Sequence, residues 1–194
     1  MAKRIIAGLG VVAGLGVALL PVGVFAADVN SQTDTLKVTI DTSCTFVEGD
    51  RTDGDGTWDE GTLSKTMTNG ETSTGFGSTK FTISCNDNGG YHLDAVGTPL
   101  NGKDNGENIP LGIASTGDSG WTIAVAGTHA VAAFASATAA PASSAAAADK
   151  VIATYTGAVS EDEITVTYGV AISDTQAADE YTGTIAYTLS HPDL

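Results

Sequence analysis

Hydrophobic and polar residues alternate with a period of two along most of the chain beyond its first thirty or so residues. The clearest example is TLKVTID at 35–41, in which three aliphatic side chains alternate with polar ones. The same alternation marks 78–85, 90–97, 120–127, 164–173 and 181–190, and more weakly 62–67, 109–114 and 150–156. Successive side chains of a strand point to opposite faces, so this pattern predicts half-buried β-strands. Many short strands between polar turns rich in Gly and Asn predict an all-β protein, and we expect a single β-sandwich.

The N-terminal segment follows a different pattern. Lys3 and Arg4 precede an uncharged run, Ile5–Leu20, which Pro21 ends, and VFA at 24–26 supplies small residues before a cleavage point. This order predicts a secretory signal peptide, residues 1–26, and a mature domain of residues 27–194. The alternative is an uncleaved membrane helix, but the run is about 16 residues long and a bilayer core needs about 20.

The segment HAVAAFASATAAPASSAAAAD at 129–149 is low in complexity. Alanine favours a helix, but Pro141 and the serines interrupt it. The composition predicts a mobile surface loop with a short helix, serving as a spacer, as a glycan-bearing stretch or as a tolerated insertion.

The charge of the chain excludes some partners. The net charge is −15, with 23 acidic and 8 basic residues, and loss of Lys3 and Arg4 makes it more negative. Nucleic acids and anionic lipids both require clustered Lys and Arg. We therefore expect no nucleic-acid partner, and no membrane contact once the signal peptide is removed.

The sequence contains two cysteines, Cys44 and Cys85. In an exported chain, two cysteines pair as a disulfide, worth about 4 kcal/mol in the chain-entropy model for this loop length. The alternative is a redox pair, although reactive cysteines usually lie close together, as in Cys-x-x-Cys.

One motif raises the question of catalysis. TGDSGW at 116–121 contains Gly-Asp-Ser-Gly, the setting of the nucleophile in trypsin-like serine proteases. That chemistry needs a histidine base and an orienting carboxylate, whereas His92, His129 and His191 are far apart in the sequence. A turn leading into the Trp121 strand explains the motif better. We expect a protein that is not an enzyme and has no cofactor, with a small secreted hydrolase as the third hypothesis.

An acidic stretch, EGDRTDGDGTWDE at 48–60, is the candidate metal site. Calcium binds six to eight oxygen ligands on flexible loops that contain glycine. The candidate ligands are Asp50, Asp53, Asp55, Asp59 and Glu60. The spacing differs from an EF-hand, because Trp58 stands where that loop needs Gly. The alternative is a solvated acidic hairpin.

Two resemblances suggest a function. YTGTIAYTLSHP at 181–192 resembles the closing motif of WxL-type domains in exported bacterial proteins, and Trp121-Thr122-Ile123 resembles their Trp-x-Leu motif. The resemblance implies a protein of the bacterial cell surface that associates with wall polymer or with a surface protein. Trp121 and Tyr187 would then lie on the contact face. Their inward strand positions suggest instead that they are core residues.

The other half of the chain resembles a second family. TIDTSCTF at 39–46 and STKFTISCNDNGGYHLDAVG at 78–97 resemble the first two strands of chaperone–usher pilins, which one disulfide joins. This resemblance implies an immunoglobulin-like sandwich and a self-associating subunit of a surface fibre. An N-terminal extension of such pilins donates a strand to the next subunit. In residues 27–35, Ala27 and Val29 are the apolar candidates for insertion.

Overall fold

The computed structural model describes residues 37–113, 115–136, 139–144, 146–147 and 150–191. The chain divides into two units, Met1–Thr39 and Ile40–Leu194, and all the strands seen among the described residues belong to the second. The predicted signal peptide, residues 1–26, lies outside the described residues. In the part of the chain that is described, no helix has the length and apolar character of a membrane span.

The larger sheet has four antiparallel strands in the order β1-β4-β10-β8. These strands are β1 (Cys44–Asp53), β4 (Thr72–Cys85), β10 (Val159–Ala171) and β8 (Gly120–Ala126). Alternate residues of β4 are buried, among them Phe81 and Ile83, and their neighbours are more exposed. The register places Ile164 of β10 opposite Phe81, which aligns the apolar positions of neighbouring strands on one face.

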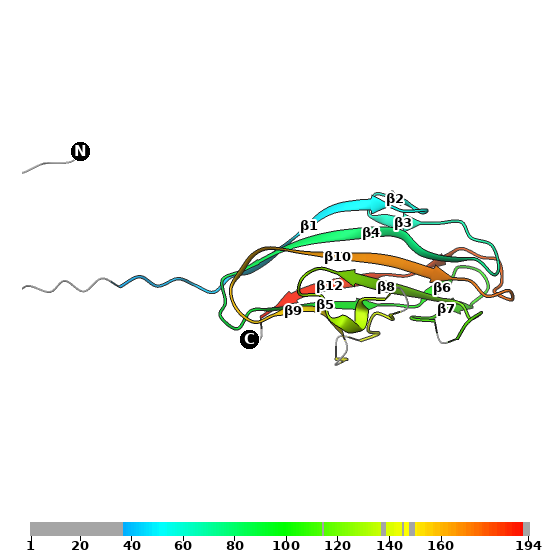
Figure 1. Cartoon of the computed structure of the whole chain (residues 1–194). Helices are drawn as coiled ribbons and strands as arrows, with labels where there is room; N and C mark the ends of the chain where they lie inside the picture. The colour runs from blue at the N-terminus through cyan, green and yellow to red at the C-terminus, as the bar shows by residue number, and fades with distance from the viewer. Residues whose placement is uncertain (1–36, 114, 137–138, 145, 148–149, 192–194) are drawn as a thin grey trace, which may run out of the picture. The chain divides into compact units, whose positions relative to one another are not determined.

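A second sheet packs against that face. It has the order β12-β5-β9, formed by β12 (Ile185–Ser190), β5 (Tyr91–Gly97) and β9 (Val151–Tyr155). Figure 1 shows β1, β4 and β10 in one layer and β5, β9 and β12 in the other. Buried residues of both sheets form one core, with Ile83, Leu93, Ile123 and Ile152 all fully shielded. The protein is therefore a β-sandwich, as predicted.

Smaller elements flank the sandwich. The short strands β11 (Tyr181–Thr182), β6 (Leu100–Gly102) and β7 (Asn108–Ile109) form a three-stranded sheet, and β2 (Thr57–Asp59) pairs with β3 (Thr62–Ser64) as a hairpin. Gly54, between β1 and this hairpin, lets the chain approach the backbone of β4, because a Cβ there would lie 1.8 Å from the backbone oxygen of Gly75. The glycines of the acidic stretch thus serve close packing.

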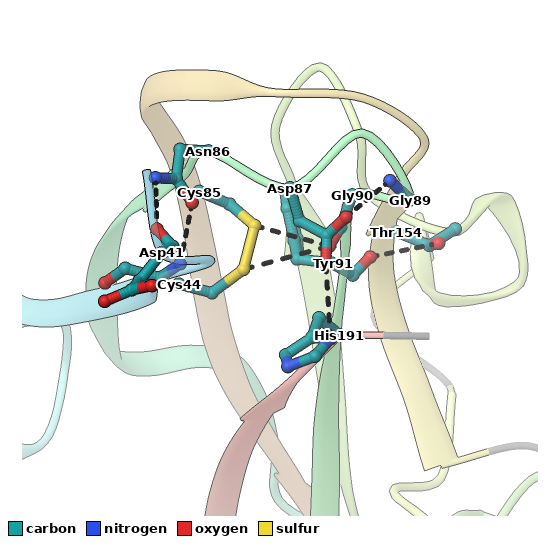
Figure 2. Close-up of a disulfide and its surroundings, with 11 residues drawn as sticks. Asp41, Cys44, Cys85, Asn86, Asp87, Gly89, Gly90, Tyr91, Thr154 and His191 are labelled. Atoms are coloured by element: carbon teal, nitrogen blue, oxygen red, sulfur yellow. Dashed lines mark hydrogen bonds and ion pairs between the residues drawn. A yellow bond between two sulfur atoms is a disulfide. The ribbon is translucent and has the colours of Figure 1, made fainter. Parts of the chain in front are cut away.

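The predicted disulfide is present. Cys44 and Cys85 are Cα partners in the antiparallel pair β1–β4, and their Sγ atoms are bonded. Figure 2 shows the bridge beside the turn that connects β4 to β5. The disulfide therefore fixes the first strand of the sandwich to its neighbour at the end where β1 begins.

The alanine-rich segment, predicted as a mobile surface loop with a short helix, packs on the sandwich through some of its described residues. It contains the short 3₁₀ helix η1 (Ala132–Phe134), and both Phe134 and Ala142 are buried. Ala139 accepts a hydrogen bond from the backbone of Ile123 at the edge of β8. Residues 129–131 exchange backbone hydrogen bonds with the free edge of β9. This segment therefore covers both sheet edges on one side of the sandwich.

Most of the predicted strands are observed, with three corrections. Of the segment 109–114, only Ile109 lies in a named strand, β7. The segment 35–41 is not a strand of the sandwich: its described residues lie outside any strand, and Val38 and Ile40 are 84% and 80% exposed. The segment 181–190 is divided, because Tyr181 belongs to β11 and pairs with β6. In β12, Ile185, Tyr187 and Leu189 face the core side and the residues between them are exposed, as the alternation predicted.

Candidate binding groove between two sheet edges

The side of the sandwich opposite the alanine-rich segment is bordered by β1 and β12. Each is the outermost strand of its sheet, since within the described residues β1 pairs only with β4 and β12 only with β5. The two strands contact each other across the gap between the sheets. An edge strand presents unpaired backbone N–H and C=O groups, so this side offers two templates for a further strand.

A groove of about 540 Å³ opens between these edges. Alternate residues of β1 and β12 point into it, as strand geometry requires. Its lining is dominated by aromatic and aliphatic side chains, namely Phe46, Trp58, Leu63, Phe76, Phe81, Leu100, Trp121, Tyr168, Ile185 and Tyr187. Such a surface favours an apolar occupant, because water gains few hydrogen bonds from it.

Two tyrosines provide the polar groups inside the groove. The hydroxyl of Tyr168 donates to Oγ1 of Thr79 over 3.1 Å and lies 2.9 Å from the hydroxyl of Tyr187. Burial raises the pKa of Tyr187 well above its usual value, and the neighbouring Tyr168 raises it further. Burial also raises the pKa of Tyr168. Both hydroxyls therefore stay protonated and serve as neutral hydrogen-bonding groups.

One rim of the groove is polar. The guanidinium of Arg51 lies 4.9 Å from the ring centroid of Trp58, and its Nη2 lies 2.6 Å from the carboxylate of Glu48. The indole N–H of Trp58 donates to the backbone oxygen of Thr52 over 3.2 Å. The hairpin residue Trp58 is thus held against the end of β1 and closes the groove there.

The predicted calcium ligands do not converge. Asp53 accepts the backbone N–H of Trp58, and Asp55 pairs with Lys65 over 2.9 Å and accepts the hydroxyl of Ser73. The hydrogen bond from Lys65 lowers the pKa of Asp55. Asp50 lies on β1, whereas Asp59 and Glu60 lie at the end and turn of the β2–β3 hairpin. Among the described residues, no group of three or more acidic, histidine or cysteine side chains is placed to hold a metal ion.

The two predicted contact aromatics both line the groove but differ in burial. Trp121 is a core residue, 5% exposed, with its indole N–H donating to the backbone oxygen of Thr98 over 3.0 Å. Tyr187 is half-buried and lines the groove, with its ring centroid 4.6 Å from that of Phe81. Trp121 is therefore a buried residue that also lines the groove, and Tyr187 lines it as a half-buried one.

The Gly-Asp-Ser-Gly motif forms a turn before β8. Its serine, Ser119, accepts a hydrogen bond from the backbone N–H of Ser173 over 2.9 Å. The histidine that follows it in the sequence, His129, is directed elsewhere: its Nδ1 lies 2.7 Å from the carboxylate of Asp162. The recorded contacts of Ser119 therefore give the protease hypothesis no support.

The exposed segment that leads into β1 is hydrogen-bonded to Asn86 at its last residues. Residues 37–43 lie outside any strand and are exposed. Asn86, which follows β4, holds the last of them: its side-chain oxygen accepts the N–H of Ser43 over 2.6 Å, and its Nδ2 donates to the oxygen of Asp41 over 3.0 Å. Figure 2 shows Asn86 and Asp41 facing each other next to the disulfide. The exposed apolar residues Val38 and Ile40 precede this attachment in the sequence.

The sequence interpretation missed β1 as an edge strand and therefore missed the groove. Phe46 stands two residues after Cys44, so both share one face of a strand, and that spacing was the available signal. The position of Trp58 has no comparable sequence signal, because a short hairpin brings this residue to the groove. No such spacing marks Phe76 either. Comparison with protein families, curated proteins and solved structures finds no match to this chain.

Proposed function

We propose that the protein is a non-catalytic structural subunit of a bacterial surface fibre, joined to the next copy by an added β-strand. The observation that carries the proposal is the apolar groove between two unpaired sheet edges. An extended peptide suits such a site, because its backbone pairs with an exposed edge while alternate side chains enter apolar pockets.

The proposed occupant is residues 36–40 of a second copy. Leu36, Val38 and Ile40 alternate with polar residues, so a strand made of them presents three aliphatic side chains on one face. Val38 and Ile40 are exposed in the single chain. Burying each aliphatic side chain contributes about 1.5–3 kcal/mol, which together with backbone pairing offsets the entropic cost of association. Residues 36–40 therefore replace 27–35 as the strand that the pilin resemblance implies.

The wall-association hypothesis receives less support. It assigned Trp121 and Tyr187 to a contact face, but Trp121 is buried and Tyr187 lies inside the groove. Nothing in these positions favours a flat aromatic surface for a polysaccharide. The fibre hypothesis also accounts for the groove and for the exposed segment together, which the wall hypothesis does not.

The proposal requires export and predicts the mature N-terminus. We expect cleavage after Ala26, which leaves residues 27–35 between the mature N-terminus and the donated strand. N-terminal sequencing of protein recovered outside the cell should begin at Ala27. Recovery of secreted protein that still carries Met1 would contradict this step.

The direct test is a charge substitution on one face of the segment. Val38→Asp combined with Ile40→Asp should abolish the filaments seen by negative-stain electron microscopy and leave a monomer in analytical ultracentrifugation. The reason is that burying an unpaired carboxylate in an apolar groove costs free energy. The matched control is Thr39→Asp, on the opposite face, which should assemble like the wild type. Filament formation by the doubly substituted protein would reject the proposal. If that protein instead pellets with purified cell walls as the wild type does, the wall-associated module is the better hypothesis.

A further inference from the structure

Two of the three residues between the donated segment and β1, Asp41 and Ser43, are hydrogen-bonded to Asn86, which follows β4. Asn86 accepts the N–H of Ser43 at its side-chain oxygen and donates its Nδ2 to the oxygen of Asp41. Its own backbone N–H donates to the oxygen of Ser43 over 3.0 Å. These contacts extend the pairing of β1 with β4 beyond the disulfide, as Figure 2 shows for Asn86 and Asp41.

The length of the connection makes self-insertion feasible. Residues 41–43 separate Ile40 from the first residue of β1, and loops of three residues commonly reverse a chain between antiparallel strands. Such a reversal would place residues 36–40 along the unpaired edge of β1 in the same molecule. The groove would then be filled by its own segment, and the subunit could not accept a second copy.

The attachment to Asn86 opposes this reversal. β1 has β4 on one edge and the groove on the other, so a turn toward the groove must carry residues 41–43 away from Asn86. Both side-chain hydrogen bonds of Asn86 to this segment would then break. We infer that Asn86 is a positioning residue that keeps the N-terminal segment out of its own groove and available to a second copy. This inference rests on the proposed strand exchange.

The experiment uses a fluorescent synthetic peptide of residues 34–42 as the probe. Its dissociation constant is measured by anisotropy at protein concentrations at which the chain is monomeric. Asn86→Ala should weaken peptide binding about fivefold, the change expected when about four in five domains are self-filled. The matched control is Asn88→Ala, an exposed asparagine of the same turn, which should bind the peptide like the wild type.

A rescue variant separates self-filling from damage to the groove. Adding Val38→Asp and Ile40→Asp to Asn86→Ala prevents the segment from entering its own groove, so peptide affinity should return to the wild-type value. Wild-type affinity in the Asn86→Ala protein would overturn the inference, as would a loss that the rescue substitutions do not reverse. If the peptide binds none of these proteins, including Val38→Asp/Ile40→Asp alone, the proposed strand exchange itself fails and the inference falls with it.

Discussion

The phenolic oxygens of Tyr168 and Tyr187 lie 2.9 Å apart, so a hydrogen bond joins β10 of one sheet to β12 of the other. Tyr168 donates in turn to Thr79, which leaves Tyr187 as the donor to Tyr168. These two hydrogen bonds lie within the apolar groove and orient the side chain of Tyr187, which lines it. They link the stability of the sandwich to the shape of its candidate site.

Removing one hydroxyl tests this link. Tyr187→Phe keeps the ring against Phe81 but deletes the donor to Tyr168, and we expect a loss of about 0.5–1.5 kcal/mol in the free energy of unfolding. Urea denaturation followed by circular dichroism measures it. An unchanged midpoint and slope would mean that the hydroxyl pair contributes nothing to stability.

The same tyrosines predict sensitivity to alkaline pH. Burial raises the pKa of Tyr168 and Tyr187 in the folded protein, whereas an unfolded tyrosine titrates near pH 10. Above about pH 10 the unfolded chain therefore binds fewer protons than the folded one, and stability falls as the pH rises. The free energy of unfolding should decrease from about pH 9 to about pH 11, and it should decrease less in Tyr187→Phe. An equal decrease in both proteins would assign the effect to other groups.

Close packing at Gly54 supplies a third prediction. A Cβ at this position would meet the backbone oxygen of Gly75 at 1.8 Å, a contact that side-chain movement cannot relieve. Gly54→Ala should destabilise the protein by about 1–3 kcal/mol or more, by the cost of overpacking. Gly75→Ala is the matched control, because its Cβ would lie 3.7 Å from Thr167, an ordinary contact. Thermal melts of equal midpoint for the two variants would show that the backbone at Gly54 is free to move.

The disulfide gives a fourth prediction. It links residues separated by 41 positions, and the chain-entropy model assigns about 4 kcal/mol to a loop of this size. Replacing both cysteines with alanine should lower the free energy of unfolding by about 2–5 kcal/mol. Mass spectrometry of the native protein without reductant should find no alkylatable thiol. Equal stability of the oxidised protein and the double variant would contradict the structural role.

The sandwich was predictable because each of its strands buries one face, and a strand with one buried face has an apolar residue at every second position. Ile83, Ile123 and Ile164 all occupy apolar positions of the predicted strands and all are fully buried. The pattern does not show whether the strand that pairs with a given segment comes from the same chain or from a second copy. Val38 and Ile40 alternate as clearly as these core residues do, yet they are exposed in the single molecule.

The candidate groove was less predictable because it depends on which strands have no neighbour on one edge. An unpaired edge on β1 or β12 follows from the order of strands in each sheet, which the alternation of residues does not encode. The acidic stretch shows a related difficulty. Its aspartates suggested metal ligands, whereas Gly54 and Gly56 determine its course by donating backbone hydrogen bonds to the oxygen of Phe76.

The position of the disulfide has a mechanical consequence. In a fibre joined through residues 36–40, tension on one subunit enters the sandwich at Cys44, the first residue of β1. The bond to Cys85 passes that tension directly to β4, a central strand with neighbours on both edges. Pulling therefore does not peel β1 away from the sheet one hydrogen bond at a time. The covalent bridge lies at the point where an extended filament would otherwise begin to unravel.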